Sequence, residues 1–219
     1  MKAMILAAGR GSRLRPLTDS IPKPLVEVQG QPLIVHHLLK LAEAGITEVV
    51  INHAWLGEQI EAQLGDGAQW GVSIEYSPEV EGGLETGGGV YQALPLLGDD
   101  PFILISADIF TSMAYHDLSS FHSMDSLAHL VLVENPEHNP HGDFGLTPQG
   151  LLTNEPQYTY SGIAVVSPRL WEASESGVYP IAPMWRKAIE QQQCTAELFI
   201  GEWSDVGTPE RLEALNAVV

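Results

Sequence analysis

The sequence contains one cysteine, Cys194, among 219 residues. A single cysteine excludes an internal disulfide framework and is typical of proteins from a reducing cytoplasm. No apolar stretch reaches the roughly 18–20 residues that cross a bilayer. The apolar run at residues 4–8 is too short for a signal peptide. We therefore expect a cytoplasmic protein, a monomer or small homo-oligomer, with Cys194 as an inert thiol.

Positive charge is also scarce. The chain has 10 Lys and Arg against 28 Asp and Glu, a formal net charge of −18, and no Lys or Arg between Leu41 and Pro168. Binding to a nucleic-acid duplex or to an anionic membrane needs a broad basic face, so we expect neither partner. The excess of acidic residues is assigned to solubility.

The few cations that are present gather at the N-terminus. Half of them lie within the first 23 residues: Lys2, Arg10, Arg13, Arg15 and Lys23. Four of these flank or lie within the glycine-rich segment AAGRGSRLR at residues 7–15. Backbone N–H groups on a glycine turn, with arginines beside them, suit phosphate oxygens. We infer a polyanion site, with a nucleoside triphosphate as the best candidate.

Apolar runs alternate with helical patterns through the first half of the chain. This rhythm predicts an α/β fold, a mostly parallel central sheet with helices on both faces (Rossmann-like). Strands are expected at residues 3–8, 48–52, 72–76 and 101–107, and helices at 32–44, 55–64 and 86–94. The carboxyl ends of such strands form the usual ligand edge.

The second half of the chain is less regular. It predicts a strand at 127–133, hairpin-like strands over 144–166 around Pro148, Gly150 and Pro156, a helix near 181–191, a late strand at 198–203, and a final helix from Pro209 to the end. No linker interrupts the sequence. We expect one domain over residues 1–219, with an irregular substrate-binding part at about 110–200.

The glycine-rich segment continues as LAAGRGSRLRPLT (6–18) and is followed by PKPL (22–25). Gly9 and Gly11 permit a tight turn, Arg13 offers a planar fork, and Lys23 is a point charge between two prolines. The spacing is neither that of a P-loop nor that of a dinucleotide-binding motif. A structural turn would explain the glycines alone, but not the neighbouring cations.

These two segments resemble the signature of the sugar-1-phosphate nucleotidyltransferases (pyrophosphorylases), and the resemblance continues along nearly the whole chain. It implies that Arg13 and Lys23 are catalytic, with Arg13 on the triphosphate and Lys23 on the reacting phosphates. It also implies nucleotide contacts along the loop, at Leu6, Ala8, Gly9, Gly11, Ser12, Arg13 and Lys23.

Two aspartates are metal candidates. Asp108 follows the strand at 101–107, and Asp205 lies in WSDVGTP (203–209), where Thr208 and Pro209 are suited to start a helix. Either aspartate could serve a turn or a cap. The resemblance implies that both hold Mg²⁺. The family usually carries Gly before the first aspartate, and this chain has Ala107.

The turn LETGGGV (84–90) places three glycines at the start of a helix, each costing about 1 kcal/mol relative to alanine. Something must therefore approach this backbone closely. By resemblance, Thr86, Gly87 and Gly88 line the nucleoside, although a structural glycine turn is the alternative.

On the sugar side, His138, His141 and Asp143 could suggest zinc, but no second ligand cluster accompanies them, and a polar loop is favoured. By resemblance, Asp143, Gly145, Glu155 and Gly162 lie near the acceptor sugar. Relatives often supply a lysine to the sugar phosphate through a Glu-Lys-Pro element. This chain has Glu155 followed by Pro156, so recognition of that phosphate differs or falls to Lys23.

The implied reaction joins a sugar 1-phosphate to a nucleoside triphosphate and releases pyrophosphate, with Mg²⁺ as cofactor. The best-matching branch uses UTP and N-acetylmuramate 1-phosphate to give UDP-N-acetylmuramate, in bacterial cell-wall recycling. One alternative is guanylyl transfer from GTP to mannose 1-phosphate. Another is a non-catalytic nucleotide-sugar sensor.

Overall fold

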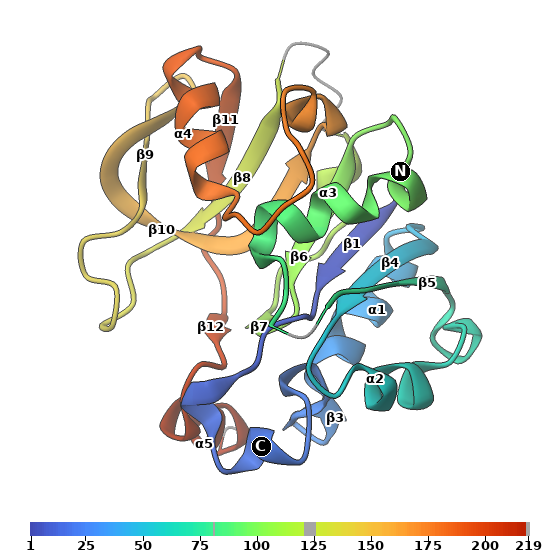
Figure 1. Cartoon of the computed structure of the whole chain (residues 1–219). Coiled ribbons are helices and arrows are strands. Elements are labelled where there is room, and N and C mark those ends of the chain that lie inside the picture. Colours follow the sequence, from blue (N-terminus) through green and yellow to red (C-terminus); the bar gives the residue numbers. More distant parts are fainter. Residues whose placement is uncertain (81, 121–125, 218–219) are drawn as a thin grey trace.

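A central sheet organises the molecule, and the computed structural model describes residues 1–80, 82–120 and 126–217. Eight strands form the sheet: β1 (Ala3–Leu6), β4 (Glu48–His53), β5 (Ser73–Pro78), β6 (Phe102–Ser106), β8 (Ala128–Val133), β9 (Phe144–Leu146), β10 (Leu152–Val166) and β11 (Cys194–Leu198). Their order is β11-β8-β10-β6-β1-β4-β5, with β9 on β10 (Figure 1).

The sheet is mostly parallel, as predicted. Strands β6, β1, β4 and β5 pair in parallel, and β11 pairs in parallel with β8. Strand β10 runs antiparallel to both β6 and β8. The carboxyl ends of β1, β4 and β6 therefore meet at one edge.

Helices cover both faces of the sheet, which confirms the predicted layering. Helices α1 (Leu33–Glu43) and α2 (Gly57–Leu64) pack on one face, and α3 (Glu85–Leu97) and α4 (Ala182–Glu190) pack on the other. Successive strand residues point to opposite faces. Thus Ile5 joins the core beneath α1, while Met4 joins the core beneath α3.

Two separate two-stranded sheets and a further helix lie outside the central sheet. Strand β7 (Ile109–Thr111) pairs antiparallel with β12 (Trp203–Asp205), β2 (Glu27–Val28) pairs with β3 (Gln31–Pro32), and α5 (Pro209–Asn216) follows. Thr208 caps α5 through its side chain, with Pro209 at the first position, as predicted. Short 3₁₀ turns lie at Ser12–Leu14 (η1), Leu17–Asp19 (η2), Lys23–Leu25 (η3), Ala68–Trp70 (η4), Asp117–Ser120 (η5) and Pro168–Trp171 (η6). Residues 218–219 of the expected final helix lie outside the described residues.

The predicted strand at 198–203 is wrong. Strand β11 ends at Leu198 after pairing with β8, and β12 begins only at Trp203 on a different partner, β7. Over residues 199–202 the chain leaves one sheet and joins another. The two ends of the apolar stretch therefore pair with different strands, Leu198 with β8 and Trp203 with β7.

The hairpin over 144–166 is confirmed at its turn and differs beyond it. Strands β9 and β10 flank the Pro148 and Gly150 turn, but β10 continues through Pro156. It does so with a shift in register between Thr153 and Tyr158. Proline has no N–H to donate to a ladder, so it fits such an irregularity.

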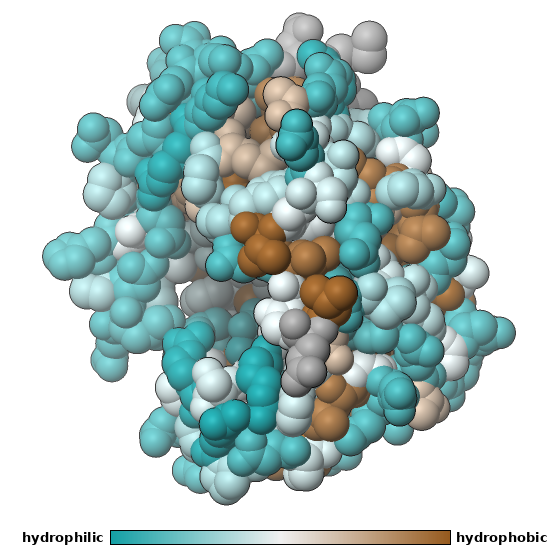
Figure 2. All heavy atoms as spheres, in the orientation of Figure 1, coloured by the Kyte–Doolittle hydropathy of each residue, from teal (hydrophilic) through white to brown (hydrophobic). Residues whose placement is uncertain are grey.

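The molecular surface agrees with the acidic composition. Hydrophilic residues cover most of the face in Figure 2, with hydrophobic side chains in small groups between them. Among the described residues, no helix combines the length and hydropathy needed to cross a membrane.

Candidate active site

A cavity of about 470 Å³ opens at the carboxyl edge of β1, β4 and β6. Several predicted nucleotide and metal residues line it: Leu6, Ala8, Gly9, Gly11, Ser12, Arg13, Lys23, Thr86 and Asp108. They come from the loop after β1, the η3 turn, the start of α3 and the end of β6. Arg13, Lys23 and the Asp108 carboxylate thus line the same cavity.

The glycine loop is fixed by close packing on Lys23. Gly11 has a φ of +67°, and a Cβ there would lie 3.1 Å from the Lys23 Cβ and 3.1 Å from the Thr18 Cγ2. The Thr18 hydroxyl also donates to the Gly11 carbonyl at 2.8 Å. Glycine is required here both by conformation and by space.

The three arginines of the loop have different surroundings. The Arg10 guanidinium lies 3.4 Å from the Trp55 ring centroid and donates to the Thr18 carbonyl. Arg15 pairs with Asp19. Arg13 lines the cavity, and its guanidinium makes no hydrogen bond or ion pair with any described residue. Arg13 is therefore the loop arginine available to a ligand.

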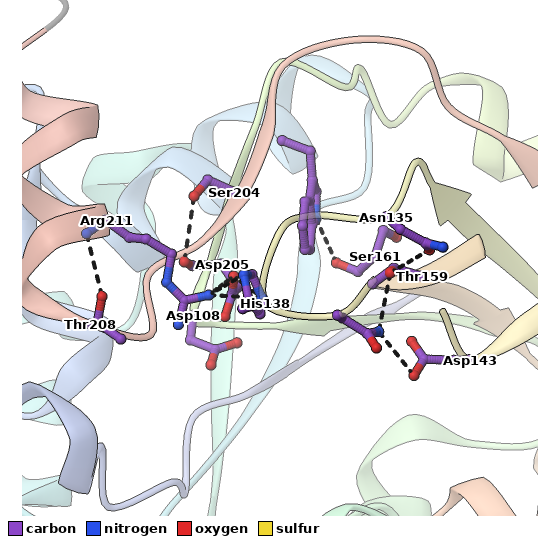
Figure 3. A network of polar contacts seen from close by, with 12 residues as sticks. Asp108, Asn135, His138, Asp143, Thr159, Ser161, Ser204, Asp205, Thr208 and Arg211 are labelled. Atoms are coloured by element: carbon purple, nitrogen blue, oxygen red, sulfur yellow. Dashed lines mark hydrogen bonds and ion pairs between the residues drawn. The ribbon is translucent and has the colours of Figure 1, made fainter. Parts of the chain in front are cut away.

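The structure brings the two predicted metal aspartates to neighbouring positions (Figure 3). Asp205 lies opposite Ile109 in the pairing of β12 with β7, and the Val206 N–H donates to the Asp108 carbonyl at 2.7 Å. Each carboxylate has its own cation: Lys23 lies 2.5 Å from Asp108, and Arg211 lies 2.5 Å from Asp205.

These residues suit a magnesium ion. Mg²⁺ is held in many phosphate-transfer sites by one or two carboxylates, with substrate phosphates and water completing its shell. Asp108 and Asp205 supply two carboxylates, with side chains 38% and 18% exposed. In the described ranges, no three His, Cys, Asp or Glu side chains cluster as potential metal ligands.

A carboxylate and an amide brace the other end of the cavity. The Asn52 side chain accepts from the Ala7 N–H at 2.9 Å and donates to Glu79 at 2.5 Å. The second Glu79 oxygen accepts from the Leu84 N–H at 2.6 Å. The ends of β1, β4 and β5 are thereby tied to the turn before α3.

Two glycines of the three-glycine turn, both predicted to contact the nucleoside, pack against another segment of the chain. Gly87 and Gly88 do not line the cavity. A Cβ at Gly87 would lie 2.5 Å from the Tyr179 ring, and one at Gly88 would meet the Gly177 carbonyl. The close approach inferred from the glycines is present, and it is made by the chain segment at 177–179.

Five hydrogen bonds join this turn to residues 171–181. The Gly87 and Gly88 N–H groups both donate to the Tyr179 carbonyl, and the Tyr179 N–H donates to the Leu84 carbonyl. The Trp171 indole donates to the Gly87 carbonyl, and the Ile181 N–H donates to the Thr86 hydroxyl. A distant segment therefore sets the shape of the turn.

None of the four predicted sugar-side residues lines the cavity, and one of them, Gly162, packs against a residue that does. Asp143, labelled in Figure 3, accepts hydrogen bonds from the Asn139 amide and from the Tyr160 N–H. Gly162 has a φ of +86° and would place a Cβ 3.0 Å from that of Ser106, which lines the cavity. Gly145 is packed against the Thr153 hydroxyl, and Glu155 is exposed on β10.

Comparison with known proteins agrees with this arrangement. The family model described as nucleotidyl transferase matches residues 2–155. The chain belongs to the nucleotidyl transferase family. It is 50% identical, over 100% of its length and 98% of the relative's, to the N-acetylmuramate alpha-1-phosphate uridylyltransferase of Neisseria meningitidis. It is 31% identical, over 98% and 95%, to the Caulobacter vibrioides enzyme of the same name.

More distant relatives share the fold or part of their length. A mannose-1-phosphate guanylyltransferase of Mycobacterium tuberculosis is 30% identical over 95% of this chain and 61% of its own. Among solved structures, one from Bacillus anthracis assigned as a glucose-1-phosphate thymidylyltransferase matches with a TM-score of 0.87. It is 24% identical and covers 100% of this chain and 94% of its own. This likeness supports the nucleotidyl transferase fold.

Sequence reasoning missed two residues of the cavity lining, Asn52 and Glu79, and two partners of Asp205, His138 and Arg211. Asn52 and Glu79 carried a usable signal, because each is a polar residue at or after the end of a buried strand. Arg211 gave a weaker one, as a cation in the first turn after the Thr208 cap.

Proposed function

We propose that this nucleotidyl transferase transfers the uridylyl group of UTP to N-acetylmuramate 1-phosphate, giving UDP-N-acetylmuramate and pyrophosphate. The observation that carries the proposal is the shared cavity of Arg13, Lys23 and Asp108 at the carboxyl edge of the sheet. The choice of base and sugar is supported by the full-length relatives.

The reaction needs positioning and charge neutralisation rather than a protein nucleophile. A phosphate oxygen of the sugar 1-phosphate forms a bond to the α-phosphorus, and the bond from that phosphorus to the bridging oxygen breaks. Pyrophosphate departs with the electron pair. Arg13 holds the departing pyrophosphate, and Lys23 neutralises charge on the reacting phosphates.

The metal part of the proposal assigns Mg²⁺ to Asp108 and Asp205. A magnesium ion held there would supply positive charge beside the reacting phosphates. Each carboxylate must first give up its protein cation, Lys23 or Arg211. Both cations then become available to phosphate oxygens in the same place.

The proposal also takes residues 1–219 as a single nucleotidyltransferase domain, with the sugar-binding part at about 110–200. Continuity of the sheet supports this, because β8, β10 and β11 pair with one another and β10 pairs with β6 of the first half. A cytoplasmic location fits a substrate such as UTP.

The decisive experiment measures pyrophosphate release for UTP, GTP, dTTP and CTP, each with N-acetylmuramate, mannose, glucose and N-acetylglucosamine 1-phosphates and Mg²⁺. We expect strong turnover with UTP and N-acetylmuramate 1-phosphate. If turnover is confined to GTP and mannose 1-phosphate, the substrate assignment is wrong but the type of reaction stands. No release with any pair leaves the sensor alternative.

A variant tests the metal assignment separately. Asp108→Asn removes one carboxylate charge and is expected to lower kcat by about 1000-fold, because charge stabilisation in the transition state is lost. Unchanged activity in Asp108→Asn removes this aspartate from the mechanism.

A further inference from the structure

The sugar half of the site lacks a cation of its own. Residues 41–168 contain no Lys or Arg, so the loop at 138–145 and strands β8, β9 and β10 cannot supply one. A sugar 1-phosphate carries close to two negative charges near neutral pH. Binding this group beside Asp108 and Asp205 requires positive charge from elsewhere in the chain.

Arg211 of α5 brings positive charge to this place. Its Nη1 lies 2.5 Å from the Asp205 Oδ1, and the His138 ring nitrogens lie 2.8 and 3.0 Å from the same Nη1. His138 belongs to the sugar-side loop. Figure 3 shows these three side chains together, with Asp108 beside them.

Much of the guanidinium remains available to a ligand. Among the described residues, every side-chain hydrogen bond and ion pair of Arg211 is made by Nη1. Nη2 lies against Gly207, where even a Cβ would collide with it, and Gly207 lines the cavity. The Arg211 side chain is 20% exposed. The Nη2 and Nε donors thus form an unused fork at the cavity wall.

The location of Arg211 complements that of the N-terminal cations. Arg13 and Lys23 reach the cavity from the loop side, and Lys23 pairs with Asp108. Arg211 lies outside the lining, against Gly207 at the C-terminal side of the cavity, and pairs with Asp205. A planar guanidinium binds two phosphate oxygens at once, which an ammonium group does not.

We infer that Arg211 binds the phosphate of the acceptor sugar 1-phosphate and supplies the positive charge that the sugar-side segments lack. The inference rests on the proposed function. If Asp205 held a metal ion, the guanidinium would lose its carboxylate partner, and the phosphate would take the place of that carboxylate. His138 stays beside the guanidinium and limits its movement.

The test compares Arg211→Gln and Arg211→Lys with wild type in steady-state assays that vary each substrate in turn. Removing a charged hydrogen-bond donor should raise KM for the sugar 1-phosphate by about tenfold or more in Arg211→Gln, with KM for UTP changing less than about twofold. Arg211→Lys should fall between, because it keeps the charge and loses the fork. Added guanidinium ion should partly restore Arg211→Gln.

Two controls separate recognition from support of Asp205. Arg169→Gln removes the same charge from an exposed side chain of η6 and should match wild type. Electron paramagnetic resonance measures the binding of Mn²⁺ to the substrate-free protein. This binding should not weaken in Arg211→Gln, because the Arg211 side chain competes with the metal ion for Asp205. Circular dichroism confirms folding, and Arg211→Lys carries the test if Arg211→Gln fails to fold.

Several outcomes overturn the inference. One is an equal rise of KM for both substrates in Arg211→Gln. Another is a loss of Mn²⁺ binding while KM for the sugar 1-phosphate stays unchanged. Either outcome would mean that Arg211 only supports Asp205. Failure of the proposed function looks different, since wild type itself would then give no product. If wild type uses another sugar 1-phosphate, the same comparison applies, because the phosphate is common to all.

Discussion

The proposed nucleotide half and the proposed sugar half of the site are built in different ways. The nucleotide half uses residues adjacent in sequence: the loop after β1 contributes Leu6 through Arg13 to the cavity without interruption. The sugar half uses neutral side chains that bond to one another, such as Asn135 and Asn139 with Thr159. A phosphate-binding half depends on concentrated charge, whereas a sugar-binding half depends on a rigid polar framework.

The largest effect that tests this comparison is expected for a substitution in the glycine loop. Arg13→Gln should lower kcat/KM for UTP by about 100-fold, because a charged donor to the triphosphate is lost. Arg15→Gln removes the same charge two residues away, at a side chain that pairs with Asp19 outside the cavity lining, and should stay within about twofold of wild type. Pyrophosphate-release assays measure both, and equal effects would mean that only the net charge of the loop matters.

A smaller effect is expected at the brace beneath the nucleoside end. Glu79→Gln leaves one acceptor where Asn52 and the Leu84 N–H now use two oxygens. We expect KM for UTP to rise about tenfold with KM for the sugar 1-phosphate unchanged. Glu75→Gln, at an exposed residue of β5, the strand just before Glu79, is the matched control. A rise in both KM values would contradict the division of the site into halves.

The matching change on the sugar side is Asp143→Asn. It replaces one of the two oxygens that hold the Asn139 amide and the Tyr160 N–H. KM for the sugar 1-phosphate should rise about fivefold and KM for UTP should not move. Glu137→Gln, exposed on the same loop, should behave as wild type. If Asp143→Asn affects UTP instead, the assignment of this loop to the sugar fails.

Two buried histidines should make the free energy of unfolding depend on pH. Burial lowers the pKa of His37, near β7, from 6.5 to about 4, and burial does the same to His129 on β8. Since the unfolded histidine gains its proton first, stability is fully present above pH 6.5 and is lost as pH falls toward 4. For His37 the loss reaches about 3 kcal/mol.

Chemical denaturation between pH 7 and pH 4 measures this effect. His37→Gln should be less stable than wild type at pH 7, because the hydrogen bonds to Tyr115 and the Ile109 carbonyl are altered. Its free energy of unfolding should also fall less steeply with acid. Parallel pH profiles for the two proteins would show that His37 is not the group that titrates.

Much of the nucleotide half could be predicted from the sequence because its signals are local. A glycine turn after a buried strand, cations beside it and an aspartate at the end of another strand all point to one edge of a parallel sheet. The nearness of Asp205 to Asp108 depended on the family resemblance, since β7 and β12 are short and lie far apart in the sequence.

The remaining parts depend on contacts that local patterns do not encode. The glycines at 87 and 88 were read as nucleotide contacts, yet their neighbours are Tyr179 and Gly177, about ninety positions away. The stretch at 198–203 is apolar enough for one strand and serves two. Arg211 looks like an ordinary residue of a helix until Asp205 is placed beside it.

The hydrogen bonds that hold the glycine turn also bear on which part of the chain can work alone. The family match ends at residue 155, but the Trp171, Tyr179 and Ile181 groups that anchor the turn lie beyond it. A fragment ending near 155 would keep every residue of the glycine loop and leave the Gly87 and Gly88 N–H groups without their acceptor. The segment that the family model matches is therefore shorter than the piece of this chain that holds the glycine turn in its observed shape.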